Sequence, residues 1–140
     1  MSQQPQPSST SALPPELQAA NASKDDRTMA MIGHLLGLVG FLGPLILFLV
    51  KKDSASKFVI YHVKQSLFFQ VALIVVMLGL GILAGVGGVA TAGVLSCVCV
   101  PVIILVPLAA IVYLIIGAVQ VNGGKDFEYW LVGPWVRKSL

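Results

Sequence analysis

The sequence contains a long stretch without any formally charged side chain. No Asp, Glu, Lys or Arg occurs in residues 65–124, a run of 60 residues. A soluble domain of this length has charged residues at intervals along the chain to cover its surface. About 20 apolar residues, in contrast, suffice for one membrane-spanning helix. The whole chain is 56% hydrophobic and 11% charged, against about 45–50% and about 25% in soluble domains. We therefore expect an all-α integral membrane helical bundle.

The apolar runs and their boundaries predict three transmembrane helices and one short interfacial helix. The apolar runs cover residues 29–50, 66–84 and 94–121, and as helices they would extend about 33, 28 and 42 Å, enough to cross the hydrocarbon core of about 30 Å or nearly so. The uncharged, glycine-rich segment 85–93 would join the second and third helices. Residues 125–138 combine aromatic with basic side chains, which is typical of the headgroup layer.

The first apolar run contains a helix breaker. Gly40 and Gly43 precede Pro44, and in a continuous helix the ring of Pro44 would clash with the carbonyl of Gly40. Residues 29–50 therefore form either one span kinked near Pro44 or two half-helices in a re-entrant hairpin. The apolar length of 22 residues favours a span, so we expect three spans and keep the hairpin as the alternative.

The N-terminal part of the chain is polar and rich in Ser, Gln and Pro. Residues 1–22 carry too little apolar area to offset the entropy of ordering, so they are predicted to be a disordered tail. The helical membrane domain would cover residues 23–140. Ser23 and Asp26 have the spacing of a capping box just ahead of the first apolar run, and this predicts the first helix start.

The distribution of Lys and Arg predicts the orientation of the chain. Basic residues flank the loop 51–57 and the C-terminus, whereas the segment 85–93 has none. Positively charged loops stay on the cytoplasmic side of a membrane, so the basic loop and the C-terminus are expected in the cytoplasm. Lys24 and Arg27 would lie outside if the first segment spans the membrane, and inside if it forms a hairpin.

Four polar side chains within the apolar region are candidates for a functional cluster: His34, His62, Gln65 and Gln70. Ionisable groups at membrane depth are costly and indicate function by default. Two interpretations compete. The histidines could bind haem or a metal, or the cluster could form hydrogen bonds between helices, which polar side chains commonly do in membranes. We favour the second. A joint His34–His62 site requires the hairpin, because a straight first span would separate the two side chains.

Other motifs are absent or point to packing. There is no Gly-x-Ser-x-Gly, His-Glu-x-x-His or phosphate-binding glycine loop, so we expect no enzymatic activity, catalytic residue, cofactor or metal. The basic residues form no stripe suited to phosphates, which excludes nucleic-acid binding. Gly33 with Gly37, and Gly81 with Gly85, have the small-xxx-small spacing of close helix packing. We expect packing within the chain rather than homodimerisation.

Three segments resemble a known family. Residues 26–35 (DRTMAMIGHL), 43–46 (GPLI) and 62–70 (HVKQSLFFQ) are similar to an uncharacterised family of small bacterial membrane proteins. That family is grouped with the Tic-twenty component of the chloroplast inner-envelope import machinery, and the resemblance covers roughly residues 24–135. It implies an all-helical protein of the bacterial cytoplasmic (inner) membrane without known enzymatic activity. It does not imply protein import, because a shared fold is no evidence of a shared task.

Three functions follow as hypotheses. The first is a non-enzymatic multi-pass membrane protein, an assembly or channel-like component that binds the bilayer and a protein partner or a second copy of itself. The second is an oligomeric pore or transporter. The third is a haem- or metal-binding redox protein using His34 and His62.

Overall fold

The computed structural model describes residues 13–140, and all regular elements in this part of the chain are helices. In chain order they are η1 (Pro15–Leu17), α1 (Lys24–Leu36), η2 (Gly37–Val39), α2 (Leu42–Lys51), α3 (Lys57–Ile82), η3 (Leu83–Gly87), α4 (Gly88–Ala90), α5 (Val94–Asn122) and α6 (Gly133–Lys138). The expected all-α class is confirmed.

Two helical segments are long and apolar enough to cross a bilayer. The first runs from Lys57 to Ala90 through α3, η3 and α4, and the second is α5, with mean hydropathies of 2.6 and 2.9 in their most apolar windows. At about 1.5 Å per residue they extend about 51 and 44 Å, more than the hydrocarbon core of about 30 Å. Within the most apolar part of each segment, only 6% and 22% of the residues are buried inside the protein. Their length, composition and exposure therefore suit membrane-crossing helices better than the core helices of a soluble protein.

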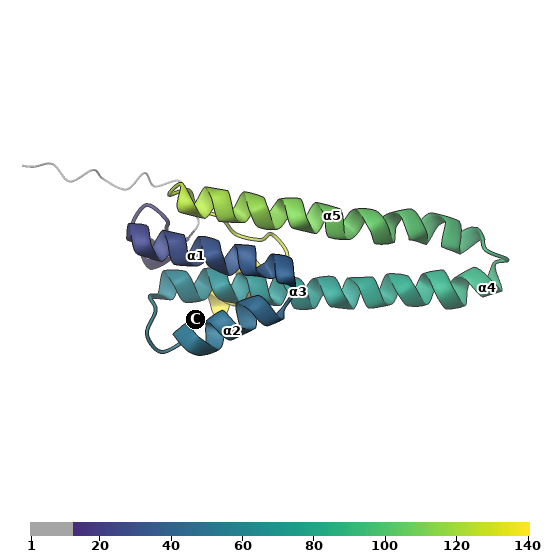
Figure 1. Cartoon of the computed structure of the whole chain (residues 1–140), viewed down its shortest axis with the longest axis horizontal. Helices are drawn as coiled ribbons and strands as arrows, with labels where there is room; N and C mark the ends of the chain where they lie inside the picture. Colours follow the sequence, from purple (N-terminus) through teal and green to yellow (C-terminus); the bar gives the residue numbers. More distant parts are fainter. Residues whose placement is uncertain (1–12) are drawn as a thin grey trace, which may run out of the picture.

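The expectation that residues 29–50 form a third span is not confirmed. This segment is divided between α1 and α2, which double back on each other, and α2 is only ten residues long. Figure 1 shows α1 and α2 beside one half of α3, with the start of α1 and the end of α2 pointing the same way. The arrangement is the helical hairpin that we kept as the alternative.

The chain reverses at Gly40 and not at Pro44. Gly40 has φ = 88° and ψ = −167°, a conformation that glycine adopts without the steric penalty of a side chain. Pro44 lies in the first turn of α2, where a missing N–H costs no helical hydrogen bond. The proline therefore begins the second helix rather than kinking a continuous one.

The molecule has two unlike ends along its long axis (Figure 1). One end gathers the start of α1, the loop between α2 and α3, the end of α5 and the C-terminus; we call it the charged end, because every charged residue lies outside residues 65–124. The other end consists of α4 and the turn into α5, without charges. Next to this uncharged end the α3–α5 pair stands alone, without α1 or α2 beside it.

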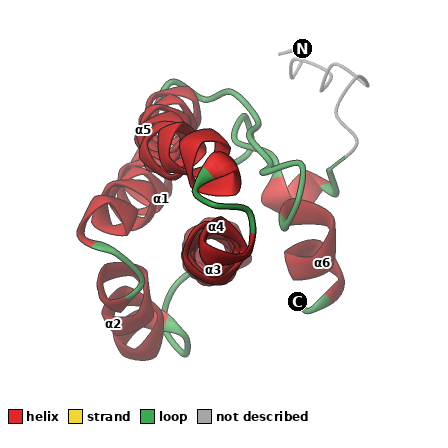
Figure 2. Cartoon of the chain, turned by 90° about the vertical axis from the view of Figure 1, so that its right-hand side faces the viewer, coloured by secondary structure: helices red, strands yellow, loops and turns green. Residues whose placement is uncertain are grey.

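Helix α1 is the centre of the packing at the charged end. It contacts both α3 and α5 extensively, more than these two helices contact each other, whereas α2 packs mainly on α3. Seen along the long axis in Figure 2, α5, α1 and α2 form an arc around one side of α3, and α6 lies on the other side. The core of buried residues therefore lies where α1 separates α3 from α5, and includes Ala30, Val63, Leu114 and Val121.

The outer face of the α1–α2 hairpin is apolar. In α2, positions i, i+4, i+7 and i+8 form a single exposed apolar stripe. Its members are Leu42, Ile46, Leu49 and Val50. An exposed stripe of this kind is stable against lipid and costly against water, so we expect the hairpin to lie in the membrane at the charged end.

Two predicted boundaries differ from the structure. Leu13 and Leu17 are buried with Tyr61 and Val136, and the backbone N–H of Ala19 donates to Asp126 Oδ1 over 2.7 Å. The predicted tail at residues 1–22 therefore does not describe residues 13–22, which fold onto the bundle; residues 1–12 lie outside the described part of the chain.

The predicted interfacial helix at 125–138 is shorter than expected. Residues 123–132 form a loop that returns between α5 and α3, and only Gly133–Lys138 is helical. Pro134 lies in the first turn of α6 and so begins the helix instead of breaking it. Both tryptophans are highly exposed, Trp130 at 77% and Trp135 at 80%, as in the interfacial belts of membrane proteins.

Cysteine labelling tests this topology. In a chain whose native Cys97 and Cys99 are replaced by alanine, we expect Ser23→Cys and Lys125→Cys to react on the same side of the membrane, and Thr91→Cys to react on the opposite side. The reason is that an even number of spans returns the chain to its starting side. Labelling of intact and permeabilised cells with an impermeant thiol reagent gives the readout. Reaction of residues 23 and 125 from opposite sides would restore the three-span arrangement.

Candidate functional site

The two histidines, which only the hairpin alternative would bring together, meet in the structure. His34 Nε2 on α1 lies 3.1 Å from His62 Nδ1 on α3, and both side chains are fully buried. The two helices start at the charged end and run in the same direction, which brings the two residues to the same depth. The sequence predicted that the two histidines could meet only if residues 29–50 form a hairpin, and in the structure they meet in a hairpin.

Tyr129 joins the pair from the loop that follows α5. Its hydroxyl lies 3.0 Å from His34 Nδ1, and its backbone N–H donates to Gln65 Oε1 over 2.8 Å. Tyr129 is fully buried. Sequence reasoning missed this residue, because its neighbours Trp130 and Trp135 made the whole segment read as headgroup-facing. The polar face of α3 is therefore used to hold the C-terminal loop.

The direction of the hydrogen bonds follows from counting donors. If the Tyr129 hydroxyl donates to His34 Nδ1, then His34 Nε2–H donates to His62 Nδ1, and both links are satisfied with neutral rings. The reverse direction needs another acceptor for the hydroxyl proton. The tautomers are assigned here from this network. In either direction His62 Nε2, together with Gln65 Nε2 and Ser66 Oγ, has no hydrogen-bond partner among the described residues.

Burial keeps this network uncharged. It lowers the pKa of His34 to about 3, because removal from water disfavours the imidazolium. Burial, and to a lesser degree the neighbouring Tyr113, raises the pKa of the Tyr129 hydroxyl above its usual value. Both groups are therefore neutral over the physiological pH range, as hydrogen-bonding links between helices rather than as charged sites.

Gln70, the fourth predicted polar residue, lies apart from the histidines. Its amide Nε2 donates to the backbone carbonyl of Gly37 over 2.7 Å, at the point where α1 passes into η2. At the break that carbonyl also accepts the backbone N–H of Gly40 over 3.1 Å, so the Gln70 amide fills the second acceptor position of a buried carbonyl. Gln70 therefore satisfies the backbone at the chain reversal.

A second polar link connects α3 with the C-terminal segment. The Tyr61 hydroxyl donates to Glu128 Oε2 in a short hydrogen bond, and Arg137 of α6 lies 3.8 Å from the same carboxylate oxygen. Sequence reasoning singled out none of these three residues, since each is of a type common at helix ends. Tyr61 and Gln65 are four residues apart and share a helical face, so one face of α3 binds the loop at two points.

Aromatic rings enclose Tyr129. The ring of Phe69 stacks on it with centroids 4.6 Å apart, and the rings of Phe127 and Tyr113 meet it edge-on at 4.8 and 5.0 Å. Such pairs add about 0.5–1.5 kcal/mol each beyond the burial of area. The C-terminal loop is therefore held by packing as well as by hydrogen bonds.

The geometry does not fit a haem iron that would take the two facing histidine nitrogens as its axial ligands. Two axial nitrogens on opposite sides of one metal, each about 2.0 Å from it, would lie about 4 Å apart, whereas the facing nitrogens are 3.1 Å apart. No group of three His, Cys, Asp or Glu residues within residues 13–140 could hold a metal ion. The cluster thus matches the hydrogen-bonding interpretation in its contacts, and the haem or metal hypothesis gains no geometric support.

The two predicted glycine pairs have different environments. A Cβ atom at Gly33 would lie 2.9 Å from Val63 Cγ2, and one at Gly37 would lie 2.8 Å from Leu114 Cδ2 and Ser66 Oγ. A Cβ at Gly81 or Gly85 would meet no atom within 4 Å. The first pair therefore lets α1 approach α3 and α5, whereas the second pair has no contact of this kind within the chain.

Removal of the Tyr129 hydroxyl tests the network. We expect Tyr129→Phe to lower the free energy of unfolding by about 1–3 kcal/mol, because His34 Nδ1 would remain buried without a partner. Tyr113→Phe is the matched control and should cost less than about 1 kcal/mol, since its hydroxyl accepts a long hydrogen bond of 3.5 Å from the backbone N–H of Trp130. Unfolding in mild detergent gives the readout. Equal losses in both variants would argue against the network.

The glycine pair is tested by adding side chains. Gly37→Val should destabilise the protein by about 1–3 kcal/mol, because the new atoms overlap Leu114 and Ser66. Gly81→Val should change the stability by less than about 0.5 kcal/mol, as substitutions without contacts do. Thermal unfolding of both variants in the same detergent provides the comparison. A greater loss for Gly81→Val would show that the free glycine pair packs on something.

Comparison with known proteins adds a family. No curated protein and no solved structure shows significant similarity to the chain, and the Tic-twenty resemblance receives no support. Residues 25–136 match the magnetosome magnetite crystal formation protein family, MamF/MmsF. The match includes α1 to α5, the C-terminal loop and all four predicted polar residues. The chain therefore belongs to the MamF/MmsF family of magnetosome magnetite crystal formation proteins.

Proposed function

We propose that this chain is a non-enzymatic membrane protein that takes part in magnetosome formation as an assembly component. The observation that carries the proposal is that the polar side chains and the exposed apolar surface lie in different parts of the molecule. The four polar side chains singled out in the apolar region, at residues 34, 62, 65 and 70, all make contacts within the chain. The α3–α5 pair beyond them exposes mainly apolar side chains to its surroundings.

The exposed pair is suited to contacts with other membrane components. Large apolar side chains are exposed along most of both helices, among them Val75, Leu78, Val86, Val98 and Leu105. In lipid such a surface carries no penalty, and helices associate there through close packing and small residues. The free Gly81 and Gly85 favour a partner helix at this place.

The charge distribution supports a cytoplasmic charged end. The nine basic and six acidic residues give a net charge of +3, and all of them lie outside the charge-free run. With an even number of spans, both flanks of the run face the same side. The retention of positive charge in the cytoplasm favours a cytoplasmic location for the loop 51–57 and the C-terminus, in the bacterial cytoplasmic membrane or one of the same orientation, with the turn 91–93 on the opposite side.

The acidic residues do not favour direct contact with a mineral. Carboxylates are the usual protein ligands for hard cations, but every Asp and Glu lies at the charged end and none lies in residues 65–124. The turn on the opposite side contains only small and apolar residues. An effect on magnetite would therefore be exerted through the membrane or through partner proteins.

An oligomeric pore or transporter is the weaker hypothesis. Two spanning helices cannot enclose a pathway, and a water-filled path would need polar groups along its walls. Past Gln70 the membrane-depth part of the pair carries Ser96 and Tyr113 as its main polar side chains. Ser96 Oγ already donates to the carbonyl of Ala84 over 2.7 Å. No feature of the pair therefore favours conduction.

Crosslinking tests the assembly role. Treatment of intact membranes with a membrane-permeant crosslinker should capture a reproducible partner or homo-oligomer, and Gly81→Val should weaken the capture by widening the helix contact. Val86→Ala is the control, since it lies on the same exposed pair without affecting the glycines. A chain that remains monomeric under all conditions would contradict the proposal.

Magnetite crystals test the link to magnetosomes. The chain would be expressed in a magnetosome-forming bacterium that lacks its own MamF/MmsF proteins, and the crystal diameter would be measured by electron microscopy. We expect the normal chain and Gly81→Ala to change the diameter, and Gly37→Val, which disturbs the charged-end packing, to do so less. Unchanged crystals in cells that hold the chain in the magnetosome membrane would contradict the proposed role.

A further inference from the structure

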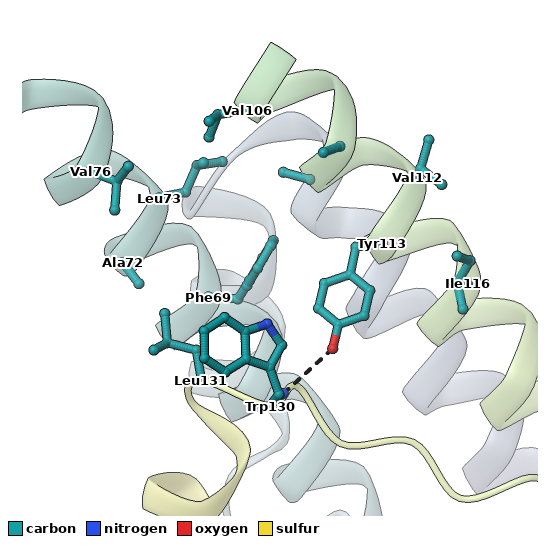
Figure 3. Close-up of a pocket in the computed structure, with 12 residues that line it drawn as sticks. Phe69, Ala72, Leu73, Val76, Val106, Val112, Tyr113, Ile116, Trp130 and Leu131 are labelled. Carbon is teal, nitrogen blue, oxygen red and sulfur yellow. Dashed lines mark hydrogen bonds between the residues drawn. The ribbon is translucent and has the colours of Figure 1, made fainter. Parts of the chain in front are cut away.

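The spanning pair contains a lateral cleft beside the C-terminal loop. Its volume is about 740 Å³, and its walls come from α3, α5 and the loop before α6. Figure 3 shows Phe69, Ala72 and Val76 on one wall and Tyr113 and Ile116 on the other. All lining side chains are apolar or aromatic, so an occupant must be apolar along most of its length.

Helix α1 accounts for the cleft. It packs against both α3 and α5 at the charged end and so holds these helices apart. The aromatic cluster around Tyr129 fills the gap at the level of the polar network. Beyond that level the walls of the cleft come from α3 and α5, with Trp130 and Leu131 of the loop at one end (Figure 3).

The length of the cleft matches one leaflet. Its lining on α5 extends from Val106 to Ile116, about 15 Å at the helical rise. The hydrocarbon core is about 30 Å thick, so one leaflet contributes about 15 Å. Phe69 begins the lining on α3 five residues after Lys64, about 7 Å farther in, which corresponds to the thickness of the headgroup layer. The cleft therefore faces the acyl chains of the leaflet at the charged end.

The closed end of the cleft is the polar end. Trp130 and Leu131 lie across it, and the Tyr113 hydroxyl accepts from the backbone N–H of Trp130 over 3.5 Å, which leaves the hydroxyl proton of Tyr113 to donate. A spanning helix of a partner needs about 30 Å and would collide with this loop. A flexible acyl chain fits the available length, and its ester carbonyl would lie beside Tyr113.

We propose that the cleft between α3 and α5 binds an acyl chain of a phospholipid from the leaflet at the charged end, with the lipid ester beside Tyr113. The net charge of +3, all of it at that end, favours an anionic headgroup through Coulomb attraction. The inference concerns lipid recognition and does not rest on the proposed role in magnetosomes. In this arrangement Trp130 lies next to the part of the bound acyl chain that is nearest to the ester.

Tryptophan fluorescence provides the test, because the chain has only two tryptophans. The full-length protein would be placed in vesicles of phosphatidylcholine with phosphatidylglycerol, whose acyl chains carry bromine as a quencher. In Trp135→Phe the remaining Trp130 reports on the cleft. Ala109→Phe, which fills the cleft, should reduce the quenching of Trp130. Leu108→Phe is the matched control, since Leu108 is exposed on the same helix and does not line the cleft.

Native mass spectrometry gives an independent measurement on the protein without substitutions. After detergent exchange we expect a retained phospholipid, preferentially phosphatidylglycerol, which Ala109→Phe loses and Leu108→Phe keeps. Circular dichroism and thermal unfolding establish that both variants are folded. Equal quenching in both variants together with no retained lipid would overturn the proposal. So would a dimer that only Ala109→Phe dissociates, because a second copy would then occupy the cleft.

Discussion

The hydrogen bond between His34 and His62 is the contact on which the architecture depends. It joins α1 to α3 at full burial, and Tyr129 extends it to the C-terminal loop. Three segments far apart in the sequence are thereby fixed at one depth. Because neither ring is charged, the link carries no cost of a buried ion. The position of α1 then determines how far α3 and α5 stand apart, and hence the shape of the lipid-facing half of the molecule.

Much of the fold could be predicted from charge and periodicity. The absence of charge over residues 65–124 located the two long apolar helices, and the helix start predicted at residue 94 agrees with α5. Ser23 caps α1 as its spacing predicted, by accepting from the Asp26 N–H over 3.0 Å. These features depend on residues that are close together in the sequence, so they can be predicted from the sequence alone.

The predictions that failed depend on tertiary contacts. Residues 29–50 have the length of a span, but length does not reveal that Gly37 approaches Leu114 and Ser66, or that Gln70 satisfies the Gly37 carbonyl. Tyr129 and Glu128 could not be assigned to the polar cluster, because their partners lie more than 60 residues away in the chain. His34 and His62 were recognised as a pair only under the hairpin alternative, since their distance is a property of topology.

The uncharged turn between α4 and α5 has a consequence for biogenesis. In a two-span arrangement, insertion carries only that turn and its two apolar arms through the lipid, and no ionised group has to follow. A three-span chain would instead transfer Lys24, Arg27 and two aspartates across the hydrocarbon core, where charged groups are costly. Because the first segment doubles back, no charged residue of that segment has to cross the bilayer. The α3–α5 pair can then insert as one unit from the side on which the chain is synthesised.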